Sequence, residues 1–212
     1  MGFSQTLRDA LADVHRRSER WDYLDALLGG TLPMAAFVEF TAQRYFLYSA
    51  FEDDDSAVRA DPVAGRFVFD ELSRLAVVRT DLEHFHGRHW EKVIEPLPAV
   101  AEHCARVREL ARDWPGGYVA QYYVRYLGDL LGGQVFREKM AKHHGLTGPG
   151  IRFYDFAGIP DVPAFRTRYH DLLDAVPWDE DEQARVVGEA IEAFDATHRF
   201  FVALADRTMQ PR

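Results

Sequence analysis

Residues 125–136 read RYLGDLLGGQVF, and they are the most informative stretch of this chain. Three glycines, Gly128, Gly132 and Gly133, fall within six positions of a segment whose apolar residues otherwise follow helical spacing. Each glycine in a helix interior costs about 1 kcal/mol relative to alanine, so three together indicate close access to the backbone. Gly128 and Gly132 lie four positions apart and share one helix face. That face accepts either a tightly packed helix or a flat ligand, and the spacing alone leaves both interpretations open.

Two charged residues accompany these glycines. Asp129 lies among them, and Arg125 precedes it by four positions, within pairing distance on a helix. A bare helix face with a carboxylate beside it is an arrangement that can do chemistry as well as pack.

The rest of the chain predicts one all-α domain that covers residues 1–212. No convincing strand alternation or internal repeat appears, and residues 145–160 form the longest predicted loop. Helices are predicted over residues 7–18, 21–28, 33–54, 67–85, 98–114, 118–144, 163–176 and 179–207.

Composition excludes several classes of protein. A net charge of −9 argues against nucleic acid as a partner, and together with the polar termini it favours a monomer. The single cysteine, Cys104, excludes a disulfide framework and favours the reducing cytoplasm. The sequence contains no run of about 20 apolar residues, so no membrane span is predicted.

Histidines at two places in the sequence are candidates for metal binding. His84, His86 and His89 lie close in sequence, but i and i+2 positions face apart on a helix, which favours a solvated helix end over a metal site. His15 has Glu19 four positions later on the same face. A carboxylate there either forms an ordinary surface pair or orients a ligating imidazole ring.

Residues 123–135, YVRYLGDLLGGQV, resemble the distal-helix motif of heme oxygenases, which has the form YxRYLGDLSGGQ. Val14 and His15, followed by Glu19, resemble the proximal-histidine segment of that family. The aromatic and acidic pattern from Phe37 to Glu52 is similar as well, and the likeness extends over about residues 5–205.

The resemblance implies a single-domain, heme-oxygenase-like helical bundle. Heme would lie between a proximal helix that carries His15 and a kinked distal helix that carries Gly128, Gly132 and Gly133. His15 would be the iron ligand, with Glu19 or a nearby group bonded to its other ring nitrogen.

The family also implies roles for polar residues around the heme. Asp129 would hold a water network that delivers protons, and Arg125 and Tyr48 would help to order it.

Arg8, Tyr123, Arg166 and His170 occupy the family's propionate-binding positions. This chain departs from the family pattern at three sites. His170 stands at a position that is usually arginine, Ala12 at a usually basic one, and Leu131 at the usual serine.

The implied activity is oxidative cleavage of heme to biliverdin, carbon monoxide and ferrous iron. Heme b is then both cofactor and substrate, O2 is consumed, and electrons come from a ferredoxin, a flavodoxin-type protein or an NAD(P)H-dependent reductase.

Two alternatives remain open. The first is a non-enzymatic heme-binding or storage protein on the same fold, against which Asp129 argues because a carrier needs no proton-relay carboxylate. A more distant one is a helical thiamin-degrading or di-iron protein, against which His15 and the lack of Glu-x-x-His pairs argue.

Overall fold

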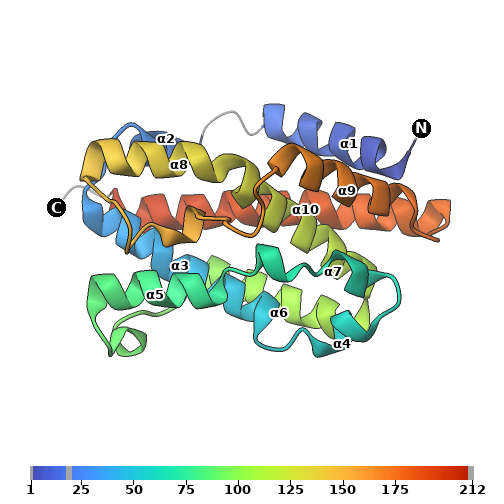
Figure 1. Cartoon of the computed structure of the whole chain (residues 1–212), viewed down its shortest axis with the longest axis horizontal. Helices are drawn as coiled ribbons and strands as arrows, with labels where there is room; N and C mark the ends of the chain where they lie inside the picture. Colours follow the sequence, from blue (N-terminus) through green and yellow to red (C-terminus); the bar gives the residue numbers. More distant parts are fainter. Residues whose placement is uncertain (1, 18–20, 210–212) are drawn as a thin grey trace.

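The computed structural model describes residues 2–17 and 21–209, and all regular structure in these ranges is helical (Figure 1). The prediction of an all-α fold is therefore confirmed. The α-helices are α1 Phe3–Arg17, α2 Asp22–Leu28, α3 Met34–Glu52, α4 Ser56–Ala60, α5 Leu75–His86, α6 Pro98–Asp113, α7 Pro115–Tyr122, α8 Gly128–His144, α9 Val162–Asp174 and α10 Glu180–Thr208. Short 3-10 turns occur at η1 Ala64–Phe67, η2 Asp70–Leu72, η3 Trp90–Lys92 and η5 Arg152–Tyr154, and η4 Tyr123–Leu127 is a π-helical segment.

The long helix α10 runs lengthwise through the middle of the bundle, as Figure 1 shows. It contacts α1, α2, α3, α6 and α7, so both the start and the middle of the chain pack against it. A continuous apolar cluster fills the space between these helices, with Phe40, Tyr126 and Phe200 among its fully buried side chains. Within the described ranges, no helix is both long and apolar enough to cross a bilayer.

The helix predicted over residues 67–85 is wrong in its first half, because regular α-helix begins only at Leu75. The carboxylate of Glu52, at the end of α3, accepts hydrogen bonds from the backbone N–H groups of Arg74 (2.7 Å) and Leu75 (3.0 Å). A side chain that satisfies the first free N–H groups sets the start of a helix. The apolar spacing before residue 75 belongs to the turns η1 and η2.

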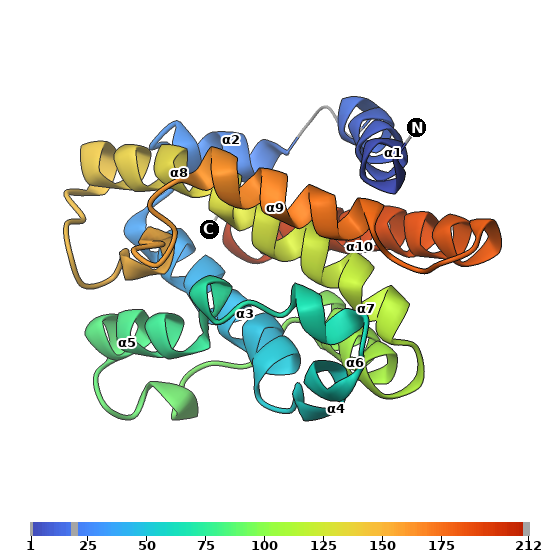
Figure 2. The ribbon, with the colours of Figure 1, turned by 45° about the vertical axis from the view of Figure 1, so that its right-hand side comes forward.

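The glycine-bearing helix begins at Pro115, three residues earlier than predicted, because proline is well suited to the first helical turn. It runs to His144, where Gly145 adopts a left-handed conformation (φ 66°) and ends it as predicted. Between α7 and α8 the π-helical segment η4 interrupts the regular hydrogen bonding, and the helix changes direction there (Figures 1 and 2). The kink therefore lies directly before Gly128.

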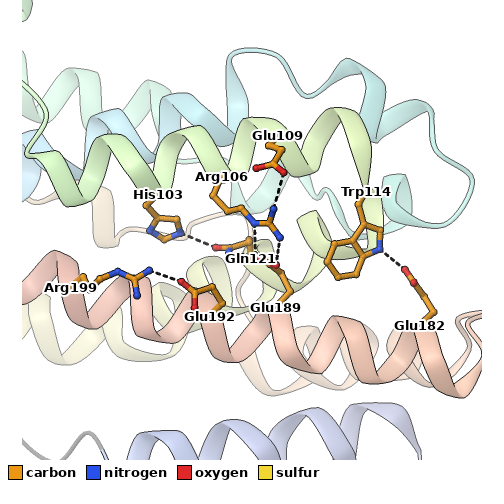
Figure 3. A network of polar contacts seen from close by, with 9 residues as sticks. All are labelled: His103, Arg106, Glu109, Trp114, Gln121, Glu182, Glu189, Glu192 and Arg199. Carbon is orange, nitrogen blue, oxygen red and sulfur yellow. Dashed lines mark hydrogen bonds and ion pairs between the residues drawn. The ribbon is translucent and has the colours of Figure 1, made fainter.

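A buried polar network joins α6, α7 and α10 on the inner side of this kinked helix (Figure 3). His103 Nε2 bonds to Gln121 Oε1 (2.8 Å), and the amide nitrogen of Gln121 donates to Glu189 (2.7 Å). Arg106 completes the network with an ion pair to Glu189 (2.6 Å). Burial, followed by the charge of Arg125, lowers the pKa of His103 to about 4, so its ring is neutral at physiological pH. The network holds α7 in place against the core.

Candidate functional site

Two adjoining cavities lie where α1, the kinked helix and α10 meet. The first has a volume of about 460 Å³ and the second about 680 Å³. Both are lined by His15, Val124, Gly128 and Phe194, so they form two parts of one space. This space is the candidate site, and its walls come from segments that are distant in sequence.

His15 projects from α1 into this space. Its side chain is exposed, and its ring meets the ring of Phe194 on α10 edge to face, with 5.8 Å between the centroids. Position 19, where the sequence places the carboxylate partner of His15, lies outside the described residues. The structure therefore places His15, the predicted iron ligand, at the cavity. Its pairing with Glu19 stays a prediction.

The glycines divide between two sides of α8. A methyl group added at Gly128 or Gly132 would meet nothing within 4 Å, whereas one at Gly133 would lie 3.4 Å from Tyr154. Gly128 and Gly132 line the cavities, and Gly133 packs against the loop that follows α8. Gly128 and Gly132 thus leave an open helix face at the cavity, as the ligand interpretation requires, whereas Gly133 is placed away from the cavity.

The carboxylate of Asp129 lies at the edge of the second cavity. Tyr48 on α3 donates its hydroxyl to Oδ2 at 2.5 Å, and the Arg125 Nη1 atom lies 3.9 Å from the same oxygen. Burial, reinforced by the neighbouring Asp129 charge, raises the pKa of Tyr48, so its hydroxyl remains a donor. Arg125 also donates to Thr197 on α10 (3.0 Å). The structure thus brings together the three predicted residues of the proton network.

A fourth polar residue of this group, Arg44, was missed by the sequence analysis. Its Nη2 donates to Oδ1 of Asp129 at 2.8 Å from α3. Burial alone would lower the pKa of this guanidinium, but the Asp129 charge outweighs it and the net direction is upward. The available signal was its spacing, because Arg44 precedes Tyr48 by four positions and shares its helix face.

The four predicted propionate partners gather at the first cavity. Arg8, Tyr123, Arg166 and His170 all line it, beside Ala12 and Leu131. Arg8 Nη1 donates to Nδ1 of His170 at 2.7 Å, and the other ring nitrogen of His170 lies 3.4 Å from the Tyr123 hydroxyl. Burial, and then the charges of Arg8 and Arg166, lower the pKa of His170. This end of the cavity therefore offers two arginines, a hydroxyl and a neutral imidazole.

The histidine cluster after residue 83 occupies the end of α5 and the turn beyond it. His84, His86 and His89 are all exposed, as expected for a solvated helix end. Across residues 2–17 and 21–209, no group of three or more His, Cys, Asp or Glu side chains is arranged to hold a metal ion by itself.

The cavity residues fit a flat ligand that carries a metal. The bare face at Gly128 and Gly132 leaves room for a planar ring, and a ring nitrogen of His15 could bind the metal of such a ligand. The cationic end at Arg8 and Arg166 suits acidic substituents on such a ring. Fold and site together fit a class of helical proteins that would hold a planar metal macrocycle in this cavity.

Comparison with known proteins gives the same result. The family model for heme oxygenase matches residues 1–203, and the chain belongs to this family. Its sequence is 31% identical over 199 residues to heme oxygenase 1 of Nostoc sp. (strain PCC 7120), covering 93% of this chain and 84% of the relative. It is 33% identical over 204 residues to heme oxygenase 1 of Gallus gallus, covering 95% and 69%.

Solved structures agree with the sequence relatives. The crystal structure of heme oxygenase-1 from the cyanobacterium Synechocystis sp. PCC6803 in complex with heme superimposes with a TM-score of 0.91 at 29% identity, covering 98% of this chain and 94% of that one. Heme oxygenase from Leptospira interrogans gives 0.88 at 27% identity, covering 95% and 98%. The chain is an enzyme that cleaves heme to biliverdin, carbon monoxide and ferrous iron, with heme as cofactor and substrate.

Proposed function

We propose that the cavity between α1 and α8 is where this chain binds and cleaves heme. The observation that carries this proposal is that His15, the bare face at Gly128 and Gly132, and Asp129 all border one cavity. When bound, heme supplies the iron that activates O2 and the porphyrin edge that is cleaved. The protein's own residues then have three tasks, which are to ligate, to orient and to move protons.

His15 is proposed to bind the iron through Nε2. Its position at the junction of both cavities lets it reach a ring that lies across them. Its edge-to-face contact with Phe194 restricts the orientation of the imidazole from the side of α10. A carboxylate or carbonyl at Nδ1, with Glu19 as the sequence candidate, would complete this orientation.

Asp129 is proposed to hold the water that would deliver protons in the second cavity. Its carboxylate is 11% exposed, enough to accept a hydrogen bond from water in the cavity. Tyr48 fixes one carboxylate oxygen, and Arg125 lies close enough to contribute positive charge. Arg125 is itself held by Thr197, so it is anchored to α10.

The group at the first cavity is proposed to anchor the two propionates. Arg8 and Arg166 supply permanent positive charge, and Tyr123 and His170 supply hydrogen-bonding groups. Because the propionates set the rotation of heme in its plane, these residues would determine which edge of the porphyrin is cleaved.

Four further features belong to this proposal. Electrons come from a separate ferredoxin, flavodoxin-type protein or NAD(P)H-dependent reductase, and residues 1–212 act as one domain. The enzyme works as a monomer, which gel filtration with and without heme tests directly. The cytoplasm stays the compartment predicted from the single cysteine.

The proposal is tested by loading the protein with heme and adding an electron donor in air. We expect the Soret band to disappear and biliverdin and free iron to form, as measured by absorbance and chromatography. A heme carrier would keep a stable Soret band, with reduction confirmed by carbon monoxide binding, and that outcome would overturn the assignment.

A further inference from the structure

Arg44 is a buried cation that links α8 on one side to η5 on the other. It projects from α3 and is only 3% exposed. Its Nη2 atom donates to Oδ1 of Asp129 on α8 at 2.8 Å, and its Nη1 atom donates to the hydroxyl of Tyr154 in η5 at 2.5 Å. Because a buried charge needs both a partner and satisfied hydrogen bonds, this two-sided contact stabilises the guanidinium where it lies.

Aromatic rings enclose the same guanidinium and limit its movement. Its central carbon lies 4.0 Å from the ring centroid of Phe40 and 4.3 Å from that of Phe153. Tyr154 and Phe136 are also within cation–π distance, at 4.9 and 5.4 Å. The Nε–H group of Arg44 has no hydrogen-bond acceptor, and aromatic rings surround the guanidinium instead. The side chain is thus held by packing as well as by polar contacts.

The loop that carries Tyr154 is itself fixed to α5. Asp81 is fully buried, and its carboxylate accepts hydrogen bonds from the backbone N–H groups of Gly150 and Phe153, both at 2.8 Å. Tyr154 stacks on Phe136 of α8, with 5.1 Å between the centroids and 10° between the planes. A rigid loop therefore holds the far side of Arg44, and Arg44 in turn contacts Asp129.

The two oxygens of Asp129 have different donors. Oδ1 takes the guanidinium of Arg44 and Oδ2 takes the hydroxyl of Tyr48, which fixes the rotation of the carboxylate about its own axis. The cation of Arg125 is farther away, at 3.9 Å, and is shared with Thr197. The close positive charge on the carboxylate is therefore that of Arg44.

We propose that Arg44 is a positioning residue for heme cleavage, which fixes the Asp129 carboxylate and compensates its charge. This inference rests on the proposed role of Asp129 in proton delivery. Arg44 acts through Asp129. Tyr154 and the aromatic rings hold the guanidinium of Arg44 in place. Removal of Arg44 should misplace the carboxylate and leave only the more distant Arg125 to compensate its negative charge.

The test compares Arg44→Met with Arg185→Met in the heme-loaded protein. Arg185 is the control, because it also pairs with a carboxylate (Glu182, 2.7 Å) and lies over an aromatic ring (Trp114, 4.2 Å), but it belongs to the start of α10 and contacts neither Asp129 nor the loop that carries Tyr154. We expect Arg44→Met to bind heme as wild type does and to lower kcat on the order of tenfold or more, with KM little changed. Arg44→Lys, which keeps the charge, should restore part of this loss.

A spectroscopic readout separates positioning from general damage. The pH at which ferric heme changes from its acid to its alkaline spectrum should rise by about one unit in Arg44→Met, because a carboxylate that has lost its closest cation disfavours a second negative charge nearby. Arg44→Lys and Arg185→Met should leave this pH unchanged. An unshifted transition together with turnover within twofold of wild type would overturn the inference, as would an equal shift in Arg185→Met.

A second variant covers the case in which Arg44→Met does not fold. Tyr154→Phe removes one anchor of Arg44 and leaves all charges in place, so kcat should fall without a shift in the spectral transition. Unchanged kcat in Tyr154→Phe would contradict the positioning role. Failure of the proposed function differs from both results, because wild-type protein itself would then return heme unaltered.

Discussion

The guanidinium of Arg8 donates to Nδ1 of His170 at 2.7 Å and thereby joins α1 to α9 at the first cavity. A guanidinium has no acceptor, so the bonded nitrogen of His170 carries no proton and the ring is neutral. Burial and the charges of Arg8 and Arg166 favour the same state by lowering the pKa of His170. This end of the cavity is cationic through its arginines alone.

Removing Arg166 and His170 together should change the proportions of the biliverdin isomers. If these groups orient the propionates, Arg166→Ala with His170→Ala lets heme bind in more than one rotation, and more than one meso carbon is cleaved. Chromatography of the product measures the ratio. The control is Arg168→Ala on the same helix, whose exposed side chain pairs with Glu71. An identical isomer pattern in the double variant would show that other residues orient the heme.

Replacing His15 by alanine should remove the iron ligand without disturbing the fold, because this side chain is exposed in the cavity. We expect the ferric heme spectrum to change and added imidazole to restore it, as followed by absorbance. His86→Ala, which alters an exposed histidine at the end of α5, is the control. A wild-type spectrum for His15→Ala would mean that another residue ligates the iron.

The Asp129→Asn variant should still bind heme but form far less biliverdin. The amide has nearly the same size, but its nitrogen cannot accept hydrogen bonds from water or from Tyr48 and Arg44. Biliverdin formation should fall at least about a hundredfold, the range of lost proton transfer, while the heme dissociation constant stays near the wild-type value. Asp53→Asn, on the surface of the protein, provides the control. Normal turnover of the Asp129 variant would rule out its role as proton relay.

Gly128→Ala should stabilise the heme-free protein and weaken heme binding. The added methyl group meets nothing within 4 Å, so the heme-free protein should gain up to about 1 kcal/mol from better helix propensity. The same methyl group occupies the space of the proposed ring and should weaken heme binding. Gly133→Ala, which faces Tyr154, should leave heme affinity unchanged.

Thermal unfolding and heme titration measure these two effects separately. Wild-type heme affinity in Gly128→Ala would show that the ring does not lie against this helix face.

The buried His103 should make the heme-free protein less stable in acid. Its pKa in the folded protein is about 4, lower than the ordinary 6.5, so the unfolded chain takes up a proton first as the pH falls. The contribution of His103 is therefore fully present above pH 6.5 and is lost toward pH 4, by about 3 kcal/mol in total. Urea unfolding at several pH values checks this.

The control for this pH dependence is a pair of variants. His103→Gln should show a shallower loss of stability between pH 6.5 and 4 than wild type, and His86→Gln should behave as wild type. Equal slopes in all three proteins would mean that His103 is already protonated, or solvated, in the folded state.

Local sequence signals were sufficient for most of the helical framework. Helical spacing together with Pro115 and Gly145 marks the long glycine-bearing helix within a few residues, because these signals act within one turn of chain. The start of α5 at Leu75 could not be read in this way. It depends on the carboxylate of Glu52, which reaches it from a different helix.

The sequence by itself predicted a helical chain, and through the family resemblance it indicated His15 and Asp129 as the candidate iron ligand and proton relay beside a glycine face. Only the tertiary structure decided that Gly128 and Gly132 face the cavity while Gly133 packs against Tyr154. It alone placed Arg44 on Asp129, across 85 positions of sequence. The physical reason is that helix periodicity fixes which residues share a face, whereas the partner of that face depends on how the helices pack.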